Sequence, residues 1–231
     1  MPIQNQITSF LEKNRVDFIR FVDITSFSKS QTQGFSTAIL FGKALTPSYL
    51  KKVASEPHYV AKMILNKTIE LDEFHNTEIA TDALADNLAA YIQQQGYQAY
   101  SQSEKNIEQS GRFNQQENRT PLPHKSIALL AGLGWIGKNN LLITPEYGCA
   151  ISMCSVLTDA PVKGIKQEIP LPRCNDCTVC RNICTPHAIV GQQWQIDTNR
   201  DVIIDVKQCN TCFMCVVNCP YTVNYINNSL L

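Results

Sequence analysis

One cysteine spacing occurs twice near the C-terminal end of the chain, and it restricts the fold more than any other feature. The first copy reads CNDCTVCRNICTP (residues 174–186) and the second reads CNTCFMCVVNCP (residues 209–220). Both follow the pattern C-x2-C-x2-C-x3-C, and a proline follows the fourth cysteine either directly or one residue later. Eight thiols at such regular intervals predict a shared inorganic ligand around which the two segments are wrapped.

The spacing is typical of segments that bind two [4Fe–4S] clusters. Three thiolates at intervals of three residues surround one cluster, while the longer x3 step carries the fourth cysteine to the cluster of the other copy. We therefore expect two clusters that exchange one ligand. Cluster A is predicted to bind to Cys174, Cys177, Cys180 and Cys219, and cluster B to Cys209, Cys212, Cys215 and Cys184.

Two other uses of cysteine fit the sequence less well. A zinc ribbon uses two C-x2-C pairs and has no need for a third cysteine two residues further on. Disulfides require an oxidising compartment, and the N-terminal segment MPIQNQITSFLEKNRVDF has neither the apolar region nor the twin arginine of an export signal. No stretch reaches the roughly 18 apolar residues of a membrane span. We expect a cytoplasmic protein without a membrane partner.

The charge balance predicts no nucleic-acid partner. Lysine plus arginine number 20, and so do aspartate plus glutamate, which gives a formal net charge of zero. Proteins that bind nucleic acids through the phosphates usually carry an excess of basic residues.

The rest of the chain has the periodicities of a mixed α/β domain. Strands are predicted at 16–22, 36–42, 97–101, 140–144 and 149–157, and helices at 77–95 and 124–131, with Gly96 as a helix stop. Residues 103–120 are polar and aperiodic and predict a surface loop. A linker rich in proline and glycine follows residue 158. We therefore expect an α/β cofactor- or substrate-binding domain at 1–160 and a ferredoxin-like domain with two [4Fe–4S] clusters at 161–231.

The glycine-rich segment AGLGWIGKNN suggests a dinucleotide site, but its context argues against one. Gly132, Gly134 and Gly137 match G-x-G-x-x-G, yet that fingerprint follows a strand and opens a helix. Here a predicted helix precedes the glycines and a short strand follows them. The glycines are expected to let the backbone pass close to a large flat ligand or to another strand, with Lys138 at the rim.

Cys149 and Cys154 lie outside both cysteine motifs. Five residues apart on one predicted strand, they would point to opposite faces and could not share a metal ion. A buried structural role is expected for both.

The segment PLPHKSIALLAGLGWIGKNNLLITPEYG, joined to the two cysteine motifs, resembles the epoxyqueuosine reductase family and, more distantly, the reductive dehalogenases. The resemblance runs from about Leu122 to Pro220. It implies an N-terminal domain like the nitroreductase-like cobalamin-processing proteins, which holds a corrinoid that receives low-potential electrons from the clusters. A ferredoxin or flavodoxin would be the electron donor. Carried over by position, the residues along the corrinoid pocket would be Gly132, Gly134, Trp135, Gly137 and Lys138.

Three features depart from the pattern of that family. Its members carry a helical-repeat extension for tRNA, whereas this chain ends eleven residues after Pro220, and the second cysteine motif of the family is often less compact. The catalytic aspartate of the family would fall near AYSQS, where this chain has Ser101. We therefore expect a related reductase that does not act on tRNA. His75, at the start of a predicted helix, resembles one member of an aromatic–histidine pair of the family.

Three functions remain compatible with the sequence. The first is an iron–sulfur reductase in which two clusters feed a corrinoid or a small-molecule substrate at the N-terminal domain. The second is an electron carrier or reductive activator whose reacting centre belongs to a partner protein. The third is a redox-sensing or cluster-carrying protein without a substrate. Corrinoid bands in a visible spectrum would separate the first from the other two.

Overall fold

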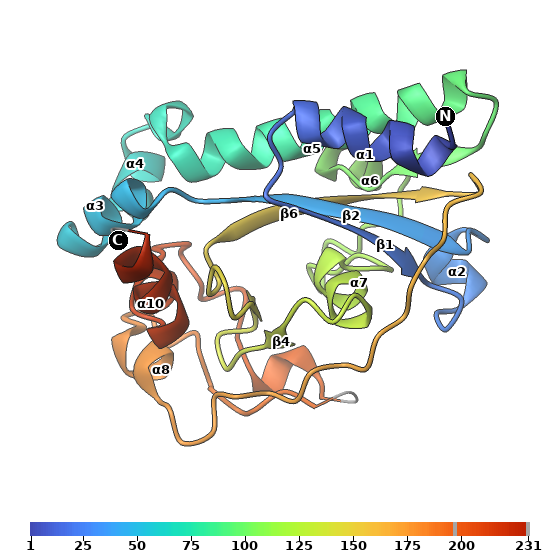
Figure 1. Ribbon diagram of the computed structural model, residues 1–231. Coiled ribbons are helices and arrows are strands. Elements are labelled where there is room, and N and C mark those ends of the chain that lie inside the picture. The colour runs from blue at the N-terminus through green and yellow to red at the C-terminus, as the bar shows by residue number, and fades with distance from the viewer. Residues whose placement is uncertain (196–197, 230–231) are drawn as a thin grey trace. The chain divides into compact units, whose positions relative to one another are not determined.

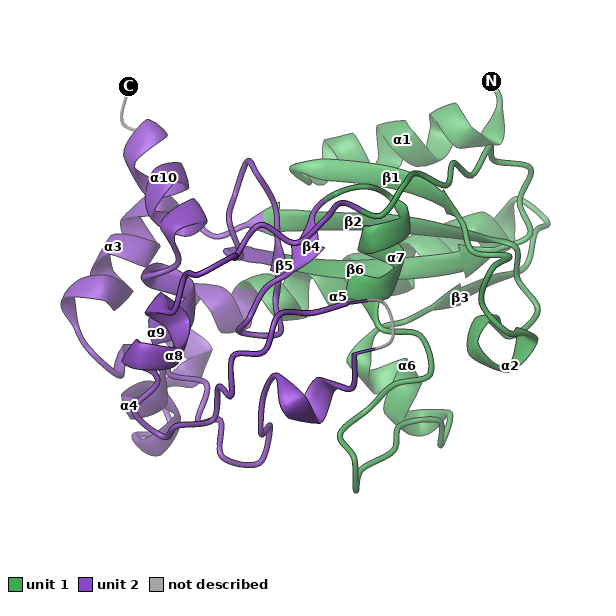
Figure 2. Cartoon of the chain, turned by 90° about the horizontal axis from the view of Figure 1, so that it is seen from below, with its two compact units in different colours: residues 1–43, 77–133, 152–169 green, residues 44–76, 134–151, 170–231 purple. Residues whose placement is uncertain are grey.

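A computed structural model describes residues 1–195 and 198–229 (Figure 1). The chain folds into two compact units, each assembled from three stretches of sequence (Figure 2). Unit 1 comprises residues 1–43, 77–133 and 152–169, and unit 2 comprises residues 44–76, 134–151 and the described part of 170–231. The two units differ from the two domains predicted at 1–160 and 161–231, because each unit combines segments that are far apart in the chain. The predicted division into a binding domain and a cluster domain stays a prediction.

Unit 1 is built on a four-stranded sheet with the strand order β1-β2-β6-β3 (Figure 1). The strands are β1 (Phe18–Asp23), β2 (Thr37–Ala44), β6 (Ile151–Thr158) and β3 (Ala99–Ser101). β1 pairs antiparallel with β2, and β3 pairs antiparallel with β6. Helices α1 (Ile3–Lys13) and α5 (Glu73–Gln94) cover one face of this sheet, and α7 (His124–Leu130) lies on the other. A short helix, α2 (Lys29–Thr32), follows β1.

The core of unit 1 is mainly aliphatic, as the helical periodicity of its apolar residues predicts. Ile3, Ile7 and Leu11 are the buried residues of α1, and their spacing of four places them on one face of the helix. Leu88 and Ile92 of α5 belong to the same core. Each such side chain contributes about 1.5–3 kcal/mol when it is fully buried.

Helix α5 begins earlier than the apolar periodicity indicates. It runs from Glu73 to Gln94 rather than over 77–95. The carboxylate of the buried Asp72 accepts the backbone N–H of His75 at 3.1 Å and so satisfies one of the free donors of the first turn. Gly96, with φ of +88°, follows the helix as the predicted stop.

Part of the predicted surface loop at 103–120 is a helix, α6 (Glu104–Gln109). Two carboxylates of α5 hold its first turn. Asp82 accepts the backbone N–H of Glu104 at 2.8 Å, and Asp86 accepts the hydroxyl of Ser103 at 2.8 Å. The prediction of a continuous loop is wrong here because the capping groups come from a different helix.

Unit 2 consists of short helices and one two-stranded sheet. The helical segments are α3 (Pro47–Ser55), α4 (Tyr59–Leu65), the 3-10 turns η1 (Ile69–Leu71) and η2 (Arg200–Val202), α8 (Val179–Ile183), α9 (Met214–Val217) and α10 (Pro220–Asn228). Strands β4 (Trp135–Ile136) and β5 (Leu142–Ile143) pair antiparallel. Helix α3 packs against α9 and α10, around a core that contains Trp135 and Ile226.

The predicted strands correspond to β1, β2, β3, β5 and β6, and the helix predicted at 124–131 corresponds to α7. The mixed α/β class is therefore confirmed. The nitroreductase-like character of the N-terminal part and the ferredoxin-like fold of the C-terminal part stay predictions. Within the ranges that the structure describes, no helix is both long and apolar enough to cross a membrane.

Candidate metal centre in unit 2

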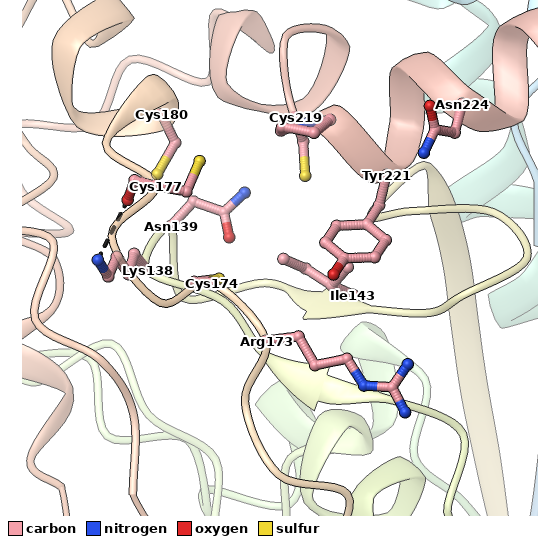
Figure 3. Close-up of a pocket in the computed structure, with 11 residues that line it drawn as sticks. Lys138, Asn139, Ile143, Arg173, Cys174, Cys177, Cys180, Cys219, Tyr221 and Asn224 are labelled. Carbon is pink, nitrogen blue, oxygen red and sulfur yellow. Dashed lines mark hydrogen bonds between the residues drawn. The ribbon is translucent and has the colours of Figure 1, made fainter.

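Four cysteines from both sequence motifs line one cavity of unit 2. The cavity has a volume of about 350 Å³, comparable to the volume of roughly twelve water molecules in the liquid. Its cysteines, here called group A, are Cys174, Cys177, Cys180 and Cys219. Figure 3 shows the group A cysteines with Asn139 and Lys138 in one part of the cavity, and Tyr221, Asn224 and the Arg173 guanidinium in the other. Group A is the set that the spacing assigns to cluster A.

The other four motif cysteines, here called group B, also interact with one another. Group B consists of Cys184, Cys209, Cys212 and Cys215. Burial and then the neighbouring charges of Cys184 and Cys209 raise the pKa of Cys212. Burial and then the other three group B cysteines, with Cys180 of group A, raise the pKa of Cys215. The fold thus brings together the residues predicted for cluster B, and their role as ligands stays a prediction.

Left-handed backbone turns let the cysteine segments bend back on themselves. Asn175, between the first two cysteines of group A, has φ of +39°. Thr211 and Phe213, on either side of Cys212, have φ of +54° and +64°. This conformation is unfavourable for a β-branched or aromatic residue and is found mostly where a functional site requires it. The short gaps between the cysteines therefore contain residues with an unfavourable backbone conformation, which a bound cluster would stabilise.

Hydrogen-bond donors surround the sulfur of Cys219 at the beginning of α10. The thiol of the buried Cys149 is the strongest of them, and the backbone N–H groups of Tyr221 and Thr222 and the Thr222 hydroxyl also contribute. Together they outweigh desolvation and lower the pKa of the Cys219 thiol to about 6. Cys180 differs, because burial and the neighbouring cysteines raise its pKa to about 11. Since metals bind the thiolate, a lowered pKa favours the form of Cys219 that binds metal.

Lys138 anchors the first cysteine segment. Its ammonium donates hydrogen bonds to the backbone carbonyls of Asn175 and Cys177, the latter at 3.1 Å. Both acceptors lie within or beside the first C-x2-C step, so Lys138 fixes that turn and adds a positive charge to the cavity wall. The sequence predicted Lys138 only as a positive contact at a rim.

The glycines of the AGLGWIGKNN segment make room for neighbouring protein atoms. A Cβ atom on Gly134 would lie 2.0 Å from the carbonyl oxygen of Ile143, and one on Gly137 would lie 2.4 Å from the Ile143 side chain. The sequence left two explanations for these glycines, a large flat ligand or a neighbouring strand. For Gly134 the neighbouring strand is the explanation. In unit 1, Gly132 has φ of +64° and lies against Gln167. Any role of these glycines toward a corrinoid stays a prediction.

Trp135 is buried rather than lining the cavity. Its ring is 1% exposed and makes an edge contact with Tyr221, with ring centroids 4.8 Å apart. The Arg173 guanidinium lies 5.5 Å from the centre of the same ring. Among the described residues, Lys138 alone of the five predicted corrinoid contacts lines the cavity.

Sequence reasoning missed the role of Cys149. It lies ahead of β6 rather than on it, and its sulfur lies 3.5 Å from the hydroxyl of Thr222 in α10. Cys154, on β6 in unit 1, instead contacts Asp82, and burial is the largest cause of its strongly raised thiol pKa. The two cysteines do not share a site, as expected. The expected reason was that both lie on one strand, and this holds for Cys154 but not for Cys149. No spacing could link Cys149 to Thr222, because they are far apart in the chain.

Two further positions carried over from the family are not among the described residues that line the cysteine cavity. Ser101 is 3% exposed at the end of β3, and its hydroxyl accepts the backbone N–H of Ser103 at 3.2 Å. His75 lies in the first turn of α5, where its backbone is capped by Asp72. Neither is brought to the cavity wall within the described part of the chain.

The cysteines are not arranged for a single metal ion. Across residues 1–195 and 198–229, no three His, Cys, Asp or Glu side chains are placed closely enough to hold one ion. The sulfurs of a four-cysteine zinc site lie roughly 3.8 Å apart, as Zn–S bonds of about 2.3 Å require. A cubane spreads its thiolate ligands more widely, because each binds a different iron.

Fold and cavity together define a mixed α/β protein in which two interleaved groups of four cysteines lie in one unit. Known proteins resemble the chain in part of its sequence and in its fold. Over 80 residues the chain is 34% identical to proteins named epoxyqueuosine reductase from Synechocystis sp. and from Pseudomonas aeruginosa. The matched segment covers 35% of this chain but only 27% and 22% of those relatives, so it spans about a quarter of their length. No protein-family model matches the chain.

Solved structures share the fold over nearly the whole chain. The catabolic reductive dehalogenase NpRdhA superimposes with a TM-score of 0.70 and 16% identity over 97% of this chain and 33% of that chain. A structure of epoxyqueuosine reductase with a tRNA stem loop gives a TM-score of 0.56 and 13% identity over 96% of this chain and 66% of that chain. Such low identities establish the fold alone. With the sequence match, they confirm the resemblance to epoxyqueuosine reductases and reductive dehalogenases.

Proposed function

We propose that the chain is a cytoplasmic, epoxyqueuosine reductase-like iron–sulfur oxidoreductase. Two [4Fe–4S] clusters, bound by groups A and B, pass low-potential electrons to a corrinoid or a small-molecule substrate at the N-terminal domain. The proposed electron donor is a ferredoxin or flavodoxin. One observation carries the proposal: the cavity of unit 2 gathers the four cysteines that the spacing assigns to one cluster, including Cys219 from the other motif.

The residues of group A fit such a cluster. The cavity has room for more than a single ion, Cys219 favours the thiolate form, and Lys138 holds the first cysteine turn in place. A bound [4Fe–4S] cluster supplies one-electron transfer at potentials that reach about −700 mV. The protein side chains contribute the ligands, the donors around one sulfur and the partial exclusion of water.

Iron and sulfide analysis of anaerobically purified protein tests the cluster assignment. We expect about eight iron atoms and eight labile sulfides per chain. Cys219→Ser should remove the spectroscopic signal of cluster A and leave that of cluster B, whereas Cys154→Ser should leave both. Four iron atoms per chain after full reconstitution would contradict two clusters. Loss of cluster B alone in Cys219→Ser would contradict the exchange of ligands.

A corrinoid acceptor is supported by the fold. A solved neighbour with a TM-score of 0.64 and 16% identity is described as a B12-dependent reductive dehalogenase. The space beside Gly134, in contrast, is filled by β5. Corrinoid absorption bands in protein supplied with cobalamin would support this acceptor, and their absence would remove it.

We also propose that the substrate is not epoxyqueuosine in tRNA. Proton delivery by a positioned acid accelerates such a reduction roughly 10²–10⁴-fold, and the buried hydroxyl of Ser101 is too weak an acid for that task. The formal net charge of zero also offers little attraction for a polyanion. The assay combines cluster-loaded protein, cobalamin, a low-potential reductant and epoxyqueuosine-containing tRNA. Turnover at the rate of the known reductases would refute this part.

A second candidate, an electron carrier or reductive activator for a partner protein, is favoured by the exposure of Cys209 in group B. An exposed ligand would bring cluster B close to the surface, where it could exchange electrons with another protein. This function predicts cluster absorption without corrinoid binding, together with reduction of a partner at a rate that depends on the partner concentration. Corrinoid retention and direct turnover of a small substrate would exclude it.

A further inference from the structure

The cavity of unit 2 extends beyond the group A cysteines. Figure 3 shows the sulfurs of Cys177 and Cys180 in one part of it and the side chains of Arg173, Tyr221 and Asn224 in the other. A cluster bound by group A would lie on the cysteine side. The other part of the cavity is therefore left for a second occupant, and the residues around it indicate the chemistry of that occupant.

Three polar groups in this second part have no hydrogen-bond partner among the described residues. They are the Arg173 guanidinium, the Tyr221 hydroxyl and the Asn224 side-chain amide. Nor does a described carboxylate form an ion pair with Arg173. Arg173 and Asn224 are exposed and Tyr221 is half-buried, so a ligand that enters the cavity can reach all three.

Contacts within unit 2 hold these groups in position. The Arg173 guanidinium lies 5.5 Å from the centre of the Trp135 ring, within the range of a cation–π interaction. The Tyr221 ring makes an edge contact with the same indole, at a centroid distance of 4.8 Å. Tyr221 and Asn224 are three residues apart on α10 and therefore lie on the same side of that helix. Groups that are already held in place lose less freedom when a ligand binds.

We propose that this part of the cavity binds a small organic carboxylate, whose anionic group pairs with the Arg173 guanidinium. The inference deepens the proposed function and rests on it, since it names the chemical class of the small-molecule substrate. A guanidinium can form two parallel hydrogen bonds to a carboxylate, and the Tyr221 hydroxyl and the Asn224 amide are further donors. Ile143 and Pro220 add apolar surface to the cavity wall and match the hydrocarbon part of such a molecule.

Charge sets the orientation of the bound molecule. Four thiolates make the cysteine side of the cavity negative, and like charges at short range repel each other. Figure 3 shows the Arg173 guanidinium pointing away from the cysteine sulfurs. The carboxylate is therefore held at Arg173, and the hydrocarbon part faces group A.

The test is calorimetric titration of the cluster-loaded protein with crotonate, and with crotonamide as a neutral probe of nearly the same shape. Crotonate should bind about tenfold more tightly than crotonamide or inorganic phosphate, which lacks a hydrocarbon part. Arg173→Met should weaken crotonate binding about tenfold and leave crotonamide unchanged, because the site is partly open to solvent and its charge is screened. Tyr221→Phe should weaken crotonate binding roughly threefold.

The chain supplies a matched control. Arg181 is also an exposed arginine directly beside a motif cysteine, but it does not line the cavity. A loss of affinity that comes only from a lower positive charge of the unit, or from a disturbed cysteine segment, would appear in Arg181→Met as well. A loss that comes from the proposed ion pair appears only in Arg173→Met.

The outcomes separate this inference from the proposed function. Equal affinities for crotonate and crotonamide in protein with full iron content, or unchanged crotonate binding in Arg173→Met, would overturn the inference alone. Tighter binding of phosphate than of crotonate would overturn the assignment to an organic carboxylate. Iron well below about eight atoms per chain would count against the proposed function itself. If Arg173→Met loads iron poorly, Asn224→Ala replaces it, and unchanged crotonate binding in that variant would equally overturn the site.

Discussion

Unit 1 and unit 2 obtain their stability in different ways. Unit 1 has a hydrogen-bonded sheet of four strands and an aliphatic core beneath two long helices. In unit 2, α8, α9 and α10 are only 5, 4 and 9 residues long, and helices of this length are not stable alone. Its core contains the aromatic pairs Trp135–Tyr221 and Phe74–Phe213 and several motif cysteines. The comparison predicts that unit 1 holds itself together, whereas unit 2 would depend on the clusters that its cysteines are proposed to bind.

The largest expected effect is the loss of structure in unit 2 on removal of iron. Binding energy at a structural metal site is also folding energy, because the site does not exist in the unfolded chain. Treatment with a chelator under reducing conditions should abolish amide-exchange protection in α8, α9 and α10. Protection in β1, β2 and α1 should stay within a factor of about two. Hydrogen exchange measured by mass spectrometry checks this, and equal loss in both units would contradict the comparison.

A methyl group at Gly134 should destabilise unit 2 through its β-hairpin. The new Cβ would lie 2.0 Å from the carbonyl oxygen of Ile143, and the hairpin must shift to accommodate it. Gly134→Ala should cost about 1–3 kcal/mol, or about 2–4 °C of melting temperature for each kcal/mol. In unit 1, Gly34 has φ of +86° with no atom within 4 Å of an added Cβ, so Gly34→Ala measures the backbone cost alone.

Thermal unfolding followed by circular dichroism compares the two variants. Gly134→Ala should also release iron from group A more readily, because Lys138 and Asn139 lie within three residues of the end of this hairpin strand. Gly34→Ala should not affect iron. If Gly134→Ala melts at the temperature of the unmodified protein, the close approach of the two strands is not as tight as the structure indicates.

Lys138→Met should loosen the first cysteine turn while the rest of unit 2 stays folded. The variant loses the hydrogen bonds of the ammonium to the carbonyls of Asn175 and Cys177, and bonds to a charged donor contribute about 1.5–3 kcal/mol before allowance for exposure. Because the lysine is partly exposed, we expect iron transfer from group A to a chelator to be roughly three- to tenfold faster. Lys138→Arg should preserve most of the protection. If iron is transferred at the same rate from both variants, the positive charge at position 138 does not contribute to cluster retention.

The smallest effect concerns pH and unit 1. Burial lowers the pKa of His124 from 6.5 to about 4, and its Nδ1 lies 2.9 Å from the hydroxyl of Ser155. The unfolded chain therefore binds a proton more readily than the folded one between these two values, and stability falls as the pH is lowered from about 6.5 towards 4. At pH 5.5 the loss should be about 1 kcal/mol relative to pH 7. Urea unfolding of the intact protein measures it, and His124→Gln should remove this part of the pH dependence.

The sequence predicted the elements whose signals are local. Strands β2 and β6 and helix α7 were found from runs of apolar residues, because burial of a whole strand or helix face leaves a mark on consecutive residues. The helix α6 was missed, because its stability comes from Asp82 and Asp86 on another helix. Capping by a distant carboxylate leaves no local pattern.

The same distinction applies to the candidate site. The spacing C-x2-C-x2-C-x3-C by itself determined which eight cysteines to consider and how to divide them into two groups, since the reach of a short loop is fixed by its length. Only the tertiary structure decided what surrounds them. It placed Cys149 against Thr222, used Lys138 to hold the first turn, and filled the space beside Gly134 with a neighbouring strand. These contacts join residues far apart in the chain, and packing of the whole unit, rather than any local preference, selects them.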